Sequence, residues 1–144
     1  MWSDTLLAAE RAHLIHLILW AASSAVLGTG ITAFLTLRRV SAPIIQWFAI
    51  QALAWGLAEL VLVAVRWRTL AMRDVSAATR LDRFTWFNAG LDVGLVVAGL
   101  TIAVLGWAYG RRLRLVGSGL GVLVQGLGLL VINFTFAAVL ARLI

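Results

Sequence analysis

The sequence has no cysteine, no lysine and a single proline among its 144 residues. Without cysteine, the chain cannot form a disulfide, offer a thiolate to a metal or carry a lipid on a thiol. Charged residues are also scarce, at 12%, about half the usual share of a soluble protein. A single small domain has too little interior to hide the 62% of residues that are apolar. The composition therefore favours a protein whose surface faces lipid.

All the basic side chains are arginines: twelve of them, against six acids, give a net charge of +6. The arginines stand in small groups between apolar runs and do not form one continuous stripe. Such groups are typical of segments that meet phospholipid headgroups. We therefore expect the lipid bilayer as a partner, and we do not expect nucleic acid.

Charged residues divide the chain into four apolar stretches, at about 12–37, 43–65, 84–109 and 116–141. Each exceeds the roughly 20 residues that an α-helix needs to cross about 30 Å of hydrocarbon. None has the polar face of a long soluble helix, and Pro43 stands where the first turn of a helix tolerates proline. The sequence predicts an all-α polytopic membrane protein: one domain, 1–144, with four transmembrane helices in an up-down bundle.

Arginine and acid are distributed unequally between the two ends of this bundle. The two short turns contain five arginines and no acid, whereas the end with both termini has seven arginines and four acids. The positive-inside rule then predicts the turns in the cytoplasm and both termini outside it. Asp4 and Glu10 precede the first apolar stretch, which is unlike a cleaved signal peptide.

The segment 66–85 is the one part of the sequence with soluble character. Its simplest interpretation is a solvated connector. Alternatively, Asp74 or Ser76 could cap a short helix over residues 76–83, which would lie along the interface or extend the third span.

Polar side chains are few inside the apolar stretches, and they agree in depth. At about 1.5 Å per residue, all four stretches contribute a polar group to one layer in the half of the bilayer nearer the termini, and Gln51 and Gln125 reach deeper. Ionisable groups near the centre of a bilayer cost roughly 2.5–3.5 kcal/mol or more, so each needs a reason. We expect them to point into the bundle as one polar layer, whose members are His13, His16, Glu59, Asn88, Asp92 and Asn133.

This layer admits several roles. Interhelical hydrogen bonds could fix the register of the helices. A carboxylate such as Glu59 or Asp92 could exchange a proton for a transported substrate. A quinone, lipid or pigment could bind between Trp20, Trp55 and the layer.

A metal or haem site is a further alternative. The Glu-x-x-His spacing of carboxylate-bridged iron bundles occurs once, in Glu10-Arg11-Ala12-His13, although such bundles normally contain it twice. A single haem would need axial ligands from opposite sides, and both histidines belong to one helix. The candidate metal ligands are Glu10, His13, His16, Glu59 and Asp92.

Catalytic patterns are weak in this sequence. We see no serine paired with a histidine at a plausible depth, and two histidines on one helix do not make a triad. The pattern favours a membrane-embedded binding or accessory subunit with an unidentified ligand and cofactor. The alternatives are a small proton-coupled transporter and a metal- or haem-binding redox subunit.

Glycines recur at four-residue spacing in the second half of the chain. Such spacing lets helix backbones approach closely, within one chain, in a homodimer or with other membrane subunits. The relevant stretches are Asn88-Ala89-Gly90-Leu91-Asp92-Val93-Gly94, then Gly117-Ser118-Gly119-Leu120-Gly121 and Gln125-Gly126. They are similar to a family of small, uncharacterised bacterial four-helix membrane proteins. The resemblance, mainly over the third and fourth spans, implies a bacterial inner-membrane setting and no particular activity.

Overall fold

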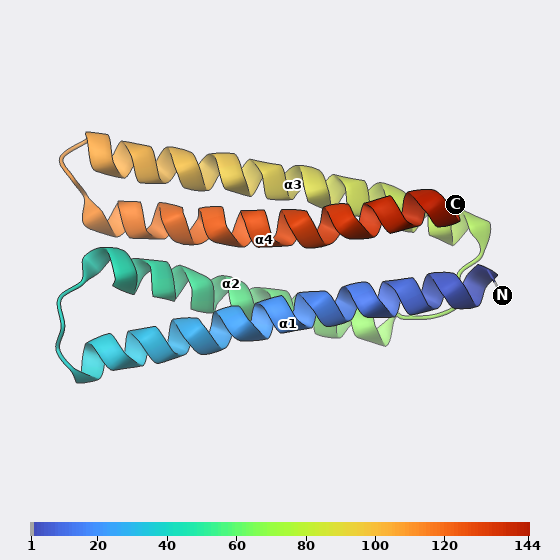
Figure 1. Cartoon of the computed structure of the whole chain (residues 1–144), viewed down its shortest axis with the longest axis horizontal. Helices are drawn as coiled ribbons and strands as arrows, with labels where there is room; N and C mark the ends of the chain where they lie inside the picture. The colour runs from blue at the N-terminus through green and yellow to red at the C-terminus, as the bar shows by residue number, and fades with distance from the viewer. Residues whose placement is uncertain (1) are drawn as a thin grey trace.

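The computed structural model describes residues 2–144, and within this range the chain is all α-helix and turns, without β-strands. The helices alternate in direction, so both termini and the α2–α3 loop lie at one end and the two short turns lie at the other (Figure 1). We call these the terminal end and the turn end. The helices are α1 (Trp2–Leu37), α2 (Pro43–Arg68), α3 (Val75–Ala108) and α4 (Leu113–Leu143).

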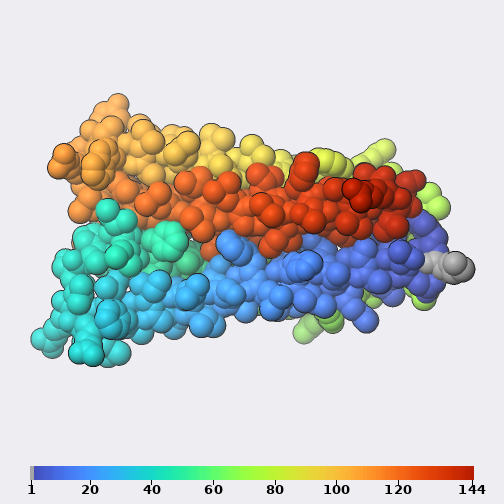
Figure 2. All heavy atoms as spheres, in the orientation of Figure 1, coloured from blue at the N-terminus to red at the C-terminus, as the bar shows by residue number. Residues whose placement is uncertain are grey.

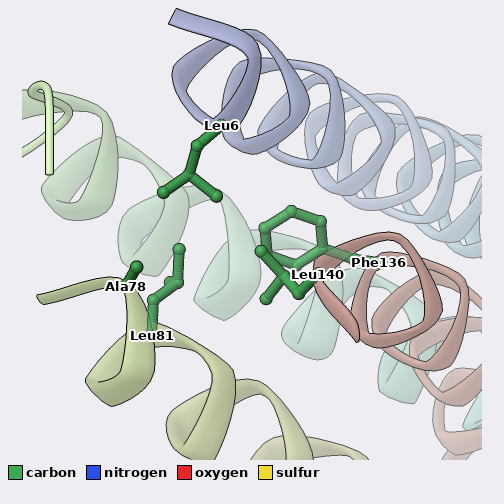
Figure 3. Packing of buried hydrophobic residues seen from close by; sticks show 5 residues of the cluster. All are labelled: Leu6, Ala78, Leu81, Phe136 and Leu140. Carbon is green, nitrogen blue, oxygen red and sulfur yellow. The ribbon is translucent and has the colours of Figure 1, made fainter. Parts of the chain in front are cut away.

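All four helices are long and apolar enough to cross a membrane. They cover the four expected spans apart from residue 109, but α1 begins ten residues and α3 nine residues before its span. At 1.5 Å per residue, the 36 residues of α1 measure about 54 Å. The surplus over about 30 Å of hydrocarbon lies at the terminal end. There an apolar cluster joins three helices, with Leu6 from α1, Ala78 and Leu81 from α3, and Phe136 and Leu140 from α4 (Figure 3).

The loop between α2 and α3 is much shorter than the solvated connector expected over residues 66–85. Only residues 69–74 lie outside the helices, so the connector interpretation is wrong for the segment from Val75 onward, which extends the third helix. Asp74 caps this helix: its carboxylate accepts hydrogen bonds from the Ala77 amide at 2.7 Å and the Ser76 hydroxyl at 3.0 Å. These bonds lower the pKa of Asp74, so the cap is retained until the pH falls through that lowered value.

The two short turns reverse the chain with left-handed backbone conformations. Arg39 has a φ of 52°, and Gly110 and Arg111 have φ values of 83° and 49°. Glycine takes this conformation at no steric cost, whereas arginine does so less readily. Pro43 then begins α2, in the first turn, where its missing N–H is no loss.

Glycines bring the helix backbones together. Gly99 of α3 and Gly119 of α4 lie against each other's helix so closely that a Cβ on either would overlap backbone atoms. Gly28 of α1 and Gly56 of α2 do the same between the first two helices. Helix α4 is central: it packs along α3, against α2 near the turns, where Gly117 meets Ile44, and against α1. The expectation of close packing through glycine is confirmed within the chain.

The outer surface of the bundle is apolar on every helix. Val26, Val61, Val97 and Val131, one from each helix, are exposed by 70%, 64%, 59% and 65%. In water, a contiguous apolar surface of this extent would drive association. This apolar surface is therefore suited to contact with lipid.

Candidate functional site

The buried polar groups form pairs between helices. Asn133 of α4 donates a hydrogen bond to the Asp92 carboxylate of α3 at 2.7 Å, and both side chains are buried. Such a bond between membrane helices contributes about 0.6–2 kcal/mol. This pair joins two members of the expected polar layer and links α3 to α4.

A second polar group joins α1 to α4, about two turns closer to the turn end. The Gln125 amide donates to the Ser24 hydroxyl at 2.9 Å, and its carbonyl oxygen accepts from the Trp20 indole, also at 2.9 Å. The indole lies over Gly128, which leaves room for it. The amide nitrogen and the carbonyl oxygen of this buried glutamine therefore both bond to residues of α1.

Glu10 is committed to an ion pair at the terminal end. Its two carboxylate oxygens accept from Arg73 Nε at 2.8 Å and from Arg73 NH2 at 2.7 Å, a bidentate pair that ties the α2–α3 loop to α1. The hydrogen bonds raise the pKa of Arg73. The pair lines a hollow of about 250 Å³ together with Arg66 and Arg80.

Glu59 of α2 and Asn88 of α3 are both half-buried. Glu59 is within electrostatic range of Arg66 on its own helix and of Asp92 on α3. Asn88 bonds to its own helix, donating to the Phe84 carbonyl at 2.8 Å.

The two histidines of α1 face different surroundings. His13 is 3% exposed and stacks on the Phe136 ring, with centroids 4.1 Å apart and planes 8° from parallel. Neither of its ring nitrogens finds a hydrogen-bond partner among residues 2–144. His16 is exposed on the outside of the bundle. The expectation that every member of the layer points inward is therefore wrong for His16.

The five candidate metal ligands do not converge. Glu10 is paired with Arg73, His16 faces outward, and Asp92 is bonded to Asn133. In the part of the chain that the structure describes, no three histidine, aspartate or glutamate side chains are grouped so that they could hold a metal ion. The Glu-x-x-His spacing instead places Glu10 at the loop and His13 against α4.

Both histidines line a groove between α1 and α4. The groove has a volume of about 450 Å³, and its walls are otherwise almost wholly apolar, apart from Thr135. Val131 and Ile132 also line a second apolar hollow of about 410 Å³ that reaches Trp20 and Gly128. The two hollows thus follow one another along the seam where α1 and α4 lie side by side (Figure 2). We call them together the α1–α4 groove.

Two features of this region were not predicted from the sequence: the pairing of Glu10 with Arg73 and the α1–α4 groove. Arg73 lies in a loop whose path no local pattern specifies. The α4 residues that line the groove are mostly apolar, like the rest of this span, so the sequence does not distinguish them. The one available signal was the pair of histidines three residues apart on α1.

Four apolar helices, held together by glycine contacts and a few buried polar pairs, define a small helical bundle of membrane-spanning dimensions. Residues 16–134 match the model of the DUF6992 family, a family of unknown function, and the chain belongs to this family. The resemblance to an uncharacterised family is thereby confirmed. No curated protein and no solved structure matches the chain.

Proposed function

We propose that the chain is a multi-pass protein of the bacterial inner membrane, with its short turns in the cytoplasm and both termini outside. The apolar outer surface supports a membrane location. The orientation is supported by Arg38, Arg39, Arg111, Arg112 and Arg114, which gather at the turn end without an acid. At the terminal end, the ion pair between Glu10 and Arg73 neutralises part of the positive charge.

Labelling of single cysteines tests this orientation, because the native chain has no cysteine to interfere. Ser41→Cys lies in the α1–α2 turn and Ala71→Cys in the α2–α3 loop, and both positions are exposed. In intact spheroplasts, we expect a membrane-impermeant maleimide to label Ala71→Cys and to label Ser41→Cys only after lysis. The reverse pattern would invert the proposed topology.

Within the membrane, we propose that the protein acts as a binding or accessory subunit that holds a quinone-like lipid in the α1–α4 groove. The observation that carries this proposal is the presence of both histidines in a groove whose other walls are almost wholly apolar. His13 is about 24 residues from the turn end of α1, or about 36 Å along the helix axis. The histidines are thus near the membrane surface, and the hollow beside Trp20 lies closer to the bilayer centre.

The chemistry of the groove suits an amphipathic ligand. An exposed imidazole on a lipid-facing surface favours a hydrogen-bonding partner, and His16 offers a donor and an acceptor. A quinone carbonyl accepts such a bond, and a hydrocarbon tail fits the apolar hollow beside Trp20. His13 lies behind His16, and its unpartnered nitrogens would gain a bond if the ring turned toward the ligand.

Proton-coupled transport ranks second to this binding function. It would use Glu59 or Asp92, but the Asp92 carboxylate already accepts a bond from Asn133. Glu59 is half-buried and lies within electrostatic range of Arg66 and of Asp92. The groove can bind a ligand without breaking the bond between Asn133 and Asp92.

Titration with decylubiquinone, a short-tailed benzoquinone, tests the binding function. Quinones quench indole fluorescence at close range, and Trp20 lines the groove. We expect saturable quenching of the protein in detergent micelles. Loss of one hydrogen bond in His16→Leu should weaken binding about tenfold, since such a bond contributes about 1.4 kcal/mol.

Asn88→Leu is the matched control, because it removes a half-buried polar side chain from α3, away from the groove. It should bind decylubiquinone as the parent does. Decanol, which has the chain without the quinone ring, should compete poorly. Non-saturable quenching, or equal binding by the parent and His16→Leu, would remove the quinone function.

We also propose a homodimer, and the glycines that remain open on α3 support one face for it. Most glycines on α3 and α4 are already packed against neighbouring helices. A Cβ at Gly90 or Gly94 would have no atom of the described chain within 4 Å beyond its own helix. These two positions are four residues apart on α3, so a dimer formed through glycine would use this face.

A further inference from the structure

A separate hollow lies at the turn end, between the first residues of α2 and α4. Its volume is about 640 Å³, and its polar lining comes from Arg112, Arg114, Ser118 and Trp47. Pro43 and Leu115 supply apolar walls. The hollow therefore combines basic and apolar lining residues at the turn end of the bundle.

The arginines of this hollow are available to a ligand. Neither Arg112 nor Arg114 forms an ion pair with any residue in the range 2–144. Their neighbour Arg111 is engaged elsewhere, with its guanidinium 5.3 Å from the centre of the Trp107 ring. The whole turn end carries five arginines and no acid, so nothing at this end offsets the positive charge.

Helix geometry adds to this charge. Helices α2 and α4 both begin at the hollow, at Pro43 and Leu113. Within the described chain, neither N-terminus is capped by a side-chain hydrogen bond from Ala42 or Arg112. The N-terminal end of a helix carries a partial positive charge, and here two such ends face the same space as two guanidinium groups.

We propose that this hollow binds the phosphate group of an anionic phospholipid. Arginine binds phosphate oxygens through paired N–H donors, which lysine does not match. Ser118 adds a hydroxyl donor, and the half-buried Trp47 supplies an indole of the kind found at membrane interfaces. Pro43 and Leu115 would contact the glycerol and the first acyl carbons. Free phosphate offers the same oxygens without the acyl chains, so the two sources can be separated by experiment.

Native mass spectrometry of the whole protein in detergent tests this site. The protein is titrated in separate arms with dioleoyl phosphatidylglycerol, inorganic phosphate and dioleoylglycerol, which lacks phosphate. We expect saturable binding of phosphatidylglycerol and little binding of dioleoylglycerol. The variant Arg112→Gln/Arg114→Gln should bind phosphatidylglycerol about tenfold or more weakly, because two charge-assisted contacts are lost.

The matched control is Arg38→Gln/Arg39→Gln, which removes two charges from the same end but outside the hollow. It should weaken binding about threefold or less, through the general loss of positive charge. Ser118→Ala gives a milder second test within the hollow. All four arginines are exposed, so circular dichroism should confirm an unchanged fold.

Binding of phosphatidylglycerol that depends on Arg112 and Arg114 would establish the site and its lipid source. Arginine-dependent binding of inorganic phosphate alone would establish the phosphate site and overturn the lipid as its source. Equal losses in the two double variants, or dioleoylglycerol binding as tightly as phosphatidylglycerol, would overturn the site. None of these results depends on the α1–α4 groove, because no residue lines both that groove and this hollow.

Discussion

Replacing Gly99 with leucine is expected to lower the free energy of unfolding by about 3 kcal/mol or more. A Cβ at this position would overlap the backbone of Leu123 and of Gly119. Backbone atoms of a packed helix cannot move aside as a flexible side chain can, so α3 and α4 would have to separate. Thermal unfolding in maltoside micelles, followed by circular dichroism, measures the effect.

Gly90→Leu is the control on the same helix. The same side chain is added there in open space, so the bundle should unfold at nearly the parent temperature. If the protein forms a dimer through this face, cross-linking should detect less dimer in Gly90→Leu. Equal melting temperatures for Gly99→Leu and the parent would show that glycine at this position does not hold α3 and α4 together.

Replacing Glu10 with glutamine is expected to destabilise the bundle by about 2–3 kcal/mol. Glu10 is 2% exposed, and its charge is balanced by a bidentate contact with Arg73. Removing one partner of a buried pair costs about 3–5 kcal/mol, and the 25% exposure of the Arg73 side chain lowers this figure. Loss of the pair should also release the α2–α3 loop from α1, detectable as faster proteolysis at residues 69–74.

A double-mutant cycle with Arg73→Gln separates the pair from other effects of the substitution. The double variant should be less destabilised than the sum of the two single variants, with a coupling energy of about 1 kcal/mol or more. Arg66 also lies within electrostatic range of Glu10, so Arg66→Gln should show a smaller coupling. Additive effects of Glu10→Gln and Arg73→Gln would mean that the contact contributes no stability of its own.

These two predictions concern two kinds of contact that hold the same helix bundle together. Glycine contacts determine how closely the helices approach in the apolar region, and polar pairs determine their register at the terminal end. The bond to Gln125 holds the Trp20 indole over Gly128, at one side of the α1–α4 groove. From there the groove continues toward His16. A ligand in the groove would therefore contact a rigid wall on the side of the indole.

The sequence by itself determined the class of fold. Apolar runs of sufficient length predict membrane-spanning helices whatever their neighbours, because each helix satisfies its own backbone hydrogen bonds. The glycine spacing predicted close packing, and of the two interpretations of the segment 66–85 the structure supports the alternative, in which Asp74 caps a helix that extends the third span. These features are local along the chain, so they can be read without knowing which helices touch.

Only the tertiary structure decided which polar groups meet. Successive residues of a helix turn by about 100°, so His13 and His16 differ by about 60°, and a small rotation of α1 decides which of them faces inward. The packing of α1 on α4 places His13 against Phe136 and leaves His16 outside. Likewise, the path of a six-residue loop brings Arg73 to Glu10, 63 positions away in the sequence. Rotation about a helix axis and the path of a loop are set by packing between helices, which the order of residues does not express locally.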